Sequence, residues 1–146
     1  MFGWRGVLGV FGWFGREISR IEHESIRYYE TIIDLDPDNA RAYYKLSNTC
    51  IRLGNYEKAL HCIEKAIVLA CRLPDSFYAY AYNSRGVIRG QQCAYTAALK
   101  DFETALELSP DNGIITTNIN RVKLVMEGNI ANHSFCLLYT SPSPRD

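Results

Sequence analysis

Apolar and aromatic side chains recur every three or four residues through most of the chain, a spacing that places them on one face of a helix. In residues 40–53 these positions are Tyr43, Leu46, Cys50 and Leu53. Gly54 and Asn55 then interrupt the pattern, and both tolerate the left-handed conformation that ends a helix. The spacing resumes over residues 56–71, so the sequence predicts two helices joined by a short turn.

The whole pattern repeats along the chain. A shift of 34 residues aligns residues 27–36 with residues 61–70, and a shift of 39 aligns the next pair of segments more closely. The second shift matches Tyr43 with Tyr82, Tyr56 with Tyr95, Ala59 with Ala98, Leu60 with Leu99, Ala66 with Ala105 and Leu69 with Leu108. The five additional residues fall between Leu69 and Ala79, in a lengthened helix end or loop. We therefore predict two complete helix pairs, at residues 40–71 and 79–109.

Half-repeats flank the two pairs. Residues 16–34 have the pattern of a second helix, residues 113–127 have that of a single first helix, and a proline followed by Asp and Asn marks each boundary, at Pro37 and Pro110. The predicted fold class is all-α: antiparallel helix-turn-helix repeats stacked as a short right-handed α-solenoid over residues 16–127. Because repeat arrays need about three units for stability, we expect marginal stability or self-association through exposed terminal repeat faces.

These residues resemble the tetratricopeptide repeat, whose signature combines aromatics, a Leu-Gly pair, two alanines and a final proline. The positions expected to pack the repeats are Tyr43, Leu46, Gly54, Tyr56, Ala59, Ala66, Tyr82, Gly86, Tyr95, Ala98, Phe102, Ala105 and Pro110. The sequence departs from the signature in having Ser47 for the first glycine, Arg85 before Gly86, Arg89 on the aromatic face, and Cys93 where Gly54 predicts glycine.

The resemblance implies an inner wall, formed by the first helix of each pair, that holds a partner peptide. The stripes expected to line this groove are Arg41, Tyr44 and Asn48, and Tyr80, Asn83 and Val87. The alternative is ordinary solvated helix surface. Some family members bind chaperone C-termini through a clamp of Lys, Arg and Asn. Asn48 fits one clamp position, but the others hold Tyr44, Ser84, Ile114 and Asn118, so chaperone-tail binding is not predicted.

Composition excludes several other functions. Lys and Arg total 16 and Asp and Glu total 16, so no net field attracts nucleic acid or an acidic membrane. The five cysteines contain no Cys-x-x-Cys pair, and the three histidines are scattered, so neither a disulfide framework nor a metal site is indicated. We expect no cofactor and no enzymatic activity.

The two ends of the sequence differ from the repeats. Residues 1–15 carry glycine at every third position, and five glycines cost a helix roughly 5 kcal/mol relative to alanine. We therefore expect a leader outside the fold and a cytoplasmic protein, with export or membrane attachment through this leader as the alternative. Residues 128–146 are expected to be a disordered tail, and residues 137–146 resemble a translated sequencing adapter, an artefact.

The sequence thus predicts a scaffold or adaptor that binds another protein or peptide. The alternative is a truncated fragment of a larger repeat protein or complex subunit that has no activity of its own.

Overall fold

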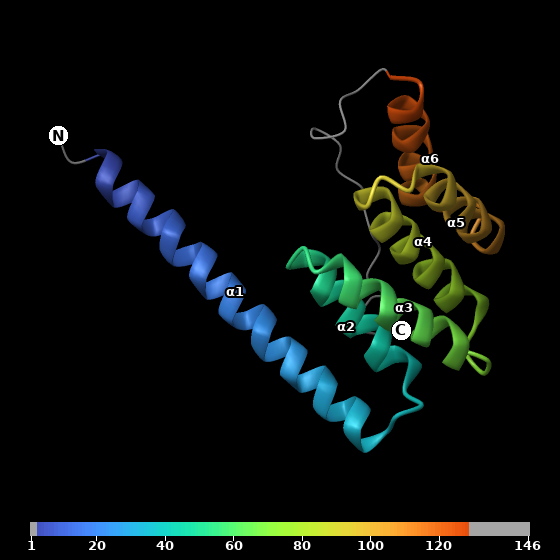
Figure 1. Ribbon diagram of the computed structural model, residues 1–146, viewed down its shortest axis with the longest axis horizontal. Coiled ribbons are helices and arrows are strands. Elements are labelled where there is room, and N and C mark those ends of the chain that lie inside the picture. The colour runs from blue at the N-terminus through green and yellow to red at the C-terminus, as the bar shows by residue number, and fades with distance from the viewer. Residues whose placement is uncertain (1–2, 129–146) are drawn as a thin grey trace.

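The computed structural model describes residues 3–128, with side chains from Gly15 onward, and this part of the chain contains helices and no strands. The prediction of an all-α fold is confirmed. Six helices follow one another along the chain: α1 (Gly3–Leu35), α2 (Ala40–Arg52), α3 (Tyr56–Leu69), α4 (Asp75–Gln91), α5 (Tyr95–Leu108) and α6 (Gly113–Met126). Helices α2 and α3 form one pair, α4 and α5 form the next, and α6 packs on α5 (Figure 1).

Asparagine caps start three of the helices. The side chain of Asn39 accepts a hydrogen bond from the amide of Ala42 at 3.0 Å, and Asn112 accepts from the amides of Ile114 and Ile115. These bonds satisfy amide groups that have no partner within the helix, and each such cap is worth about 1 kcal/mol. The boundaries predicted at Pro37 and Pro110 are therefore confirmed, because an asparagine two residues after each proline caps the next helix. Asn55 caps α3 in the same way.

The offset of 39 residues relates the second helices of the two pairs. Helix α5 has the same 14-residue length as α3 and starts 39 positions later. The first helices differ, because α4 has 17 residues and α2 has 13. The prediction that the second pair begins at Ala79 was wrong, since α4 begins at Asp75. Four of the five additional residues form an extra first turn, which Pro74 and the buried Phe77 help to fix.

Helix α1 is longer than the sequence predicts. It begins at Gly3 and runs without a break to Leu35, so residue 16 is not a helix boundary and the glycine-rich segment is helical. Residues 16–35 supply the helix nucleus, and extending a nucleated helix is much easier than starting one. In Figure 1 the N-terminal part of α1 projects beyond the other helices. That residues 1–15 lie outside the folded domain stays a prediction, and residues 129–146, with the adapter-like segment, lie outside the described residues.

Small side chains at the helix crossings let the paired helices approach closely. Ala59, Ala66, Ala98 and Ala105 are all fully buried. In the first pair, the hydroxyl of Ser47 donates a hydrogen bond to the carbonyl oxygen of Ala59 at 2.8 Å, which explains why serine replaces glycine there.

The helix crossing of the second pair is packed by a glycine and a large aromatic ring. A Cβ atom added to Gly86 would lie 2.6 Å from the ring of the buried Phe102, so the larger ring occupies the space that glycine leaves. In the first pair the equivalent residues are Ser47 and Ile63. The aromatic positions Tyr43, Tyr56, Tyr82 and Tyr95 are half-buried around this core, and Pro110 is exposed at the end of α5.

The turn of the second pair carries backbone strain. Gly54 ends the first turn with a φ of 74°, and Cys93, at the equivalent position, has a φ of 61°. Cys93 is the one non-glycine residue of residues 3–128 with a positive φ. The left-handed conformation costs an L-residue roughly 1–2 kcal/mol.

We expect the substitution Cys93→Gly to raise the free energy of unfolding by about 0.5–1 kcal/mol, after allowance for the greater freedom of glycine in the unfolded chain. Urea unfolding in reducing buffer measures this change. Cys93→Ala is the matched control, because alanine keeps the strain, and it should leave stability nearly unchanged. Equal effects of glycine and alanine would show that the turn is not strained.

Candidate peptide-binding wall

The six residues predicted to line a groove lie on the two complete first helices. Arg41, Tyr44 and Asn48 come from α2, and the other three from α4. Arg41 is exposed and Tyr80 is half-buried, whereas Tyr44, Asn48, Asn83 and Val87 are buried. We call the face of the first helices α2, α4 and α6 that carries Tyr44, Asn48, Asn83 and Asn118 the wall.

Polar side chains link each first helix of the wall to the next. The hydroxyl of Ser84 donates to Oδ1 of Asn48 at 3.1 Å, which joins α4 to α2. Nδ2 of Asn118 donates to Oδ1 of Asn83 at 3.0 Å, which joins α6 to α4. All four side chains are buried. Buried hydrogen bonds of this kind fix the positions of their partners, so these two bonds hold the first helices in register.

One donor of the wall has no acceptor. Among the described residues, Nδ2 of Asn48 is the one buried side-chain nitrogen or oxygen atom that has no hydrogen-bond partner. Leaving such a donor unsatisfied costs about 1–3 kcal/mol. The atom lies on the face where the resemblance places the ligand, so an acceptor oxygen brought by a peptide could bind it.

Aromatic contacts extend the wall toward the start of α4. The rings of Tyr44 and Phe77 meet edge to face, with centroids 5.4 Å apart. The guanidinium of Arg41 lies 5.8 Å from the centroid of the Phe77 ring, within the range of a cation–π contact. Phe77 belongs to the additional turn of α4, so this turn adds a buried aromatic ring beside Tyr44.

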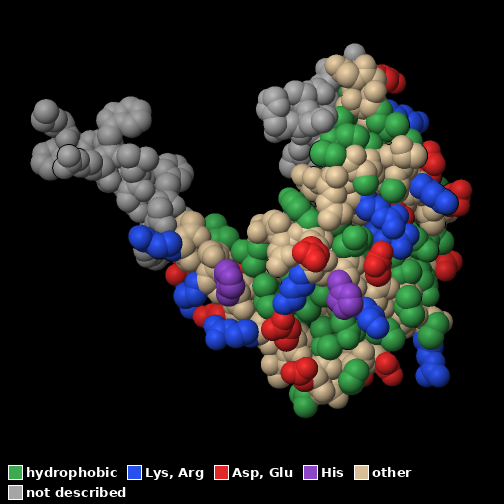
Figure 2. Space-filling model, viewed as in Figure 1, with side chains coloured by type: hydrophobic (Ala, Val, Ile, Leu, Met, Phe, Trp, Pro, Cys, Tyr) green, Lys and Arg blue, Asp and Glu red, His purple; other side chains and the backbone are tan. Residues whose placement is uncertain are grey.

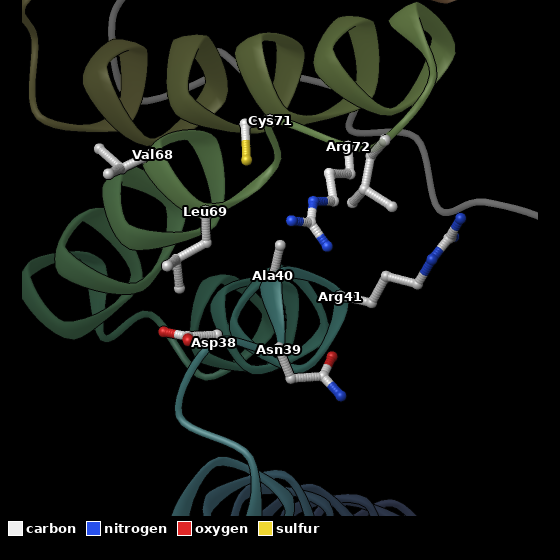
Figure 3. Close-up of a pocket in the computed structure, with 9 residues that line it drawn as sticks. Asp38, Asn39, Ala40, Arg41, Val68, Leu69, Cys71 and Arg72 are labelled. Carbon is white, nitrogen blue, oxygen red and sulfur yellow. The ribbon is translucent and has the colours of Figure 1, made fainter.

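A pocket of about 560 Å³ lies beside Arg41, between the start of α2 and the end of α3. Figure 3 shows Cys71 and Arg72 reaching into it from the turn after α3, and Ala40 facing it from α2. Arg41 and Arg72 provide two positive charges and Asp38 one negative charge. This pocket was not predicted from the sequence, because the turn of chain after α3 brings its residues together.

An ion cluster in the second pair was also not predicted from the sequence. Nη2 of Arg85 and Nη1 of Arg89 lie 2.8 Å and 2.9 Å from the two carboxylate oxygens of Asp101, which is buried. Arg85 also lies over the ring of Tyr82 at 5.1 Å. The offset of 39 maps these three charged residues onto apolar residues of the first pair: Leu46, Cys50 and Cys62. The two arginines that depart from the family signature thus share one carboxylate.

The described residues outside the wall carry mixed surface charges and two buried thiols, Cys50 and Cys62. Lys and Arg side chains are interspersed with Asp and Glu over the face seen in Figure 2. Burial raises the pKa of the Cys62 thiol to about 11 and also raises that of Cys50, so both stay protonated and unreactive at neutral pH. No group of metal-binding side chains, and no helix long and apolar enough to cross a bilayer, occurs among the described residues.

Comparison with known proteins decides the family. A family model described as Tetratricopeptide repeat matches residues 38–111, which is half of the chain. The chain belongs to the tetratricopeptide repeat family. Over 110 residues this tetratricopeptide repeat protein is 31% identical to DnaJ homolog subfamily C member 7 of Mus musculus. That match covers 72% of the chain and 20% of the mouse protein, so the chain spans about one fifth of that relative's length.

Solved tetratricopeptide repeat structures share the fold. The first repeat domain of Spaghetti (RPAP3), bound to the HSP90 peptide SRMEEVD, has a TM-score of 0.67 and 28% identity, and covers 75% of this chain and 82% of its own. The second repeat domain of human RPAP3, in complex with the HSP70 peptide SGPTIEEVD, has a TM-score of 0.63 and 28% identity. This match covers 77% of this chain and 87% of the RPAP3 domain. Both of these similar proteins therefore hold a peptide.

Proposed function

We propose that this tetratricopeptide repeat protein is a scaffold that binds an extended segment of a partner protein along the wall of α2, α4 and α6. The observation that carries the proposal is the unsatisfied Nδ2 of Asn48. A carbonyl or carboxylate oxygen of a peptide is the acceptor that this donor lacks. Because the atom is shielded from solvent, a peptide reaches it only with a shift of the surrounding side chains, a common adjustment on binding.

The segment bound is not an acidic chaperone tail of the kind held by the similar RPAP3 domains. The clamp by which some family members bind chaperone C-termini needs cationic side chains at three positions. These positions hold Tyr44, Ile114 and Asn118 in this chain. Without these charges an acidic tail gains no charge-assisted hydrogen bonds on the wall, although such bonds are the strong ones.

The peptide SRMEEVD tests this selectivity. We expect no saturable binding of a fluorescent SRMEEVD peptide up to about 1 mM, which corresponds to a binding free energy weaker than about −4 kcal/mol. Fluorescence anisotropy measures it, with a repeat domain known to bind the peptide as the positive control. A dissociation constant in the low micromolar range would contradict the proposed selectivity.

A ligand for the wall can be found with a displayed library of random peptides. We expect a selected peptide to lose about tenfold in affinity, or about 1.4 kcal/mol, with the variant Asn48→Ala, as measured by calorimetry. Asn120→Ala is the matched control, because Asn120 is an exposed asparagine of α6. Peptides that bind both variants as tightly as the unchanged protein would show that Asn48 takes no part.

A further inference from the structure

The pocket beside Arg41 differs from the wall in its chemistry. Three charged side chains line it, those of Asp38, Arg41 and Arg72, together with apolar ones from Leu69 and Leu73. All three charged residues are exposed, so a ligand can reach them from solvent. A cavity of about 560 Å³ that combines apolar lining with a few charged groups is typical of a binding site.

The charges in the pocket are separated by sign. Figure 3 shows Arg72 directed into the pocket on the side of Arg41, and Asp38 on the opposite side, near Leu69. The contact of Arg41 with the ring of Phe77 keeps its guanidinium at the edge of the pocket. Two positive charges against one negative charge favour a ligand that is itself negative.

Arg72 has no partner in the described part of the chain. It makes no ion pair or hydrogen bond there, and Asp38 of the same pocket does not pair with it. Arg20, Arg52 and Arg85, by contrast, each pair with a carboxylate of the chain. A guanidinium presents a planar set of donors that matches the two oxygens of a carboxylate. A carboxylate is therefore the ligand group that best fits Arg72.

We propose that this pocket binds one acidic side chain of the partner segment, with its carboxylate on Arg72. The inference rests on the proposed function, because the segment must lie along the wall to place a residue here. The two sites are continuous: Arg41 lines the pocket and lies one helical turn before Tyr44 of the wall. A segment that continues past the start of α2 therefore reaches the pocket.

Asp38 restricts the pocket to a single acidic residue, since a second carboxylate would meet its negative charge. An exposed ion pair changes affinity by no more than about fivefold. The pocket therefore selects among segments that already bind the wall. It does not by itself capture a peptide with several acidic residues, such as SRMEEVD.

Cys71 allows the pocket to be tested without a peptide. Its exposed thiol lines the pocket and forms mixed disulfides by exchange with a small disulfide, which releases one thiol of the reagent for each bond formed. The protein is equilibrated with the disulfides and thiols of mercaptopropionate, mercaptoethanol and cysteamine, and mass spectrometry of its peptides measures each adduct. We expect mercaptopropionate to be favoured over mercaptoethanol about threefold at Cys71, and cysteamine to be disfavoured.

Cys93, the other exposed cysteine of the described residues, is the internal control and should show no such preference. Arg72→Gln should abolish the preference at Cys71, and Arg72→Lys should retain it. Arg16→Gln makes the same change of charge at an exposed residue in the projecting part of α1 and should have no effect. Equal adduct ratios at Cys71 and Cys93, or a preference that survives Arg72→Gln, would overturn the proposal.

The library-selected peptide tests the acidic residue itself. We expect Arg72→Gln to lower its affinity about threefold in calorimetry. Replacement of one acidic residue of the peptide by glutamine should have the same effect on the unchanged protein and none on the Arg72→Gln variant. A peptide that responds to Asn48→Ala but not to Arg72→Gln would support the wall and overturn the pocket proposal. The reverse response would support the pocket and contradict the wall.

Discussion

Replacement of Asp101 by alanine is expected to lower the free energy of unfolding by about 3–5 kcal/mol, because it leaves two partly buried arginines without their shared carboxylate. The side chains of Arg85 and Arg89 are 19% and 26% exposed, so neither can return fully to water without leaving its place between α4 and α5. Chemical denaturation with circular dichroism measures the change. Glu103→Ala, which removes an exposed carboxylate from the same helix, is the control and should cost less than about 0.5 kcal/mol.

A triple variant tests whether apolar residues can replace the ion cluster at the same positions. Arg85→Leu, Arg89→Cys and Asp101→Cys together give the second pair the three residues of the first pair. Since a buried ion cluster is often no more stabilising than well-packed apolar residues, the triple variant should regain most of the loss or exceed the unchanged protein. If Asp101→Ala alone costs less than about 1 kcal/mol, the arginines do not depend on this carboxylate and the account of the cluster is wrong.

Replacement of Phe102 by alanine is expected to cost about 3–5 kcal/mol, because it empties the fully buried space beside Gly86. The same contact makes the effect of Gly86→Ala depend on residue 102. With Phe102 present, the new methyl group would meet the ring at 2.6 Å, and overpacking should destabilise the protein by about 1–3 kcal/mol. With alanine at residue 102, Gly86→Ala should instead stabilise the helix by about 1 kcal/mol.

A double-mutant cycle measured by urea unfolding gives both values. The decisive result is the sign of the Gly86→Ala effect in the two backgrounds. Effects of the same sign and size would show that Gly86 and Phe102 are not coupled, and the paired fit of a small and a large residue in the second repeat would then be wrong.

The recurring alanines and tyrosines predicted the second helices well. Ala59 and Ala98 occupy equivalent places in α3 and α5 because a close helix crossing admits only a small side chain there, and this requirement is visible in the sequence. The start of α4 was not visible, since an additional helical turn and a longer loop insert the same number of residues. Local helix propensity likewise gave the wrong start for α1, because it counts each glycine separately and neglects extension from a nucleated helix.

The site was less predictable than the fold. Arg85 and Arg89 departed from the family signature, and their partner Asp101 is recognisable only when all three positions are compared with Leu46, Cys50 and Cys62 at the common offset. The bonds of Asn48 and Asn83 to neighbouring first helices depend on side-chain geometry, which the sequence does not specify. The pocket beside Arg41 depends on the path of the loop after α3, and no repeated residue marks it.

The central claim is that the wall of α2, α4 and α6 binds the partner segment. Nuclear magnetic resonance of isotope-labelled protein, titrated with a library-selected peptide, tests it most directly, because the side-chain amide signals of Asn48, Asn83 and Asn118 report on the wall itself. The account predicts that these signals and the backbone signals of the three first helices shift most. Shifts centred on α3 and α5, with the three asparagine signals unchanged, would contradict it.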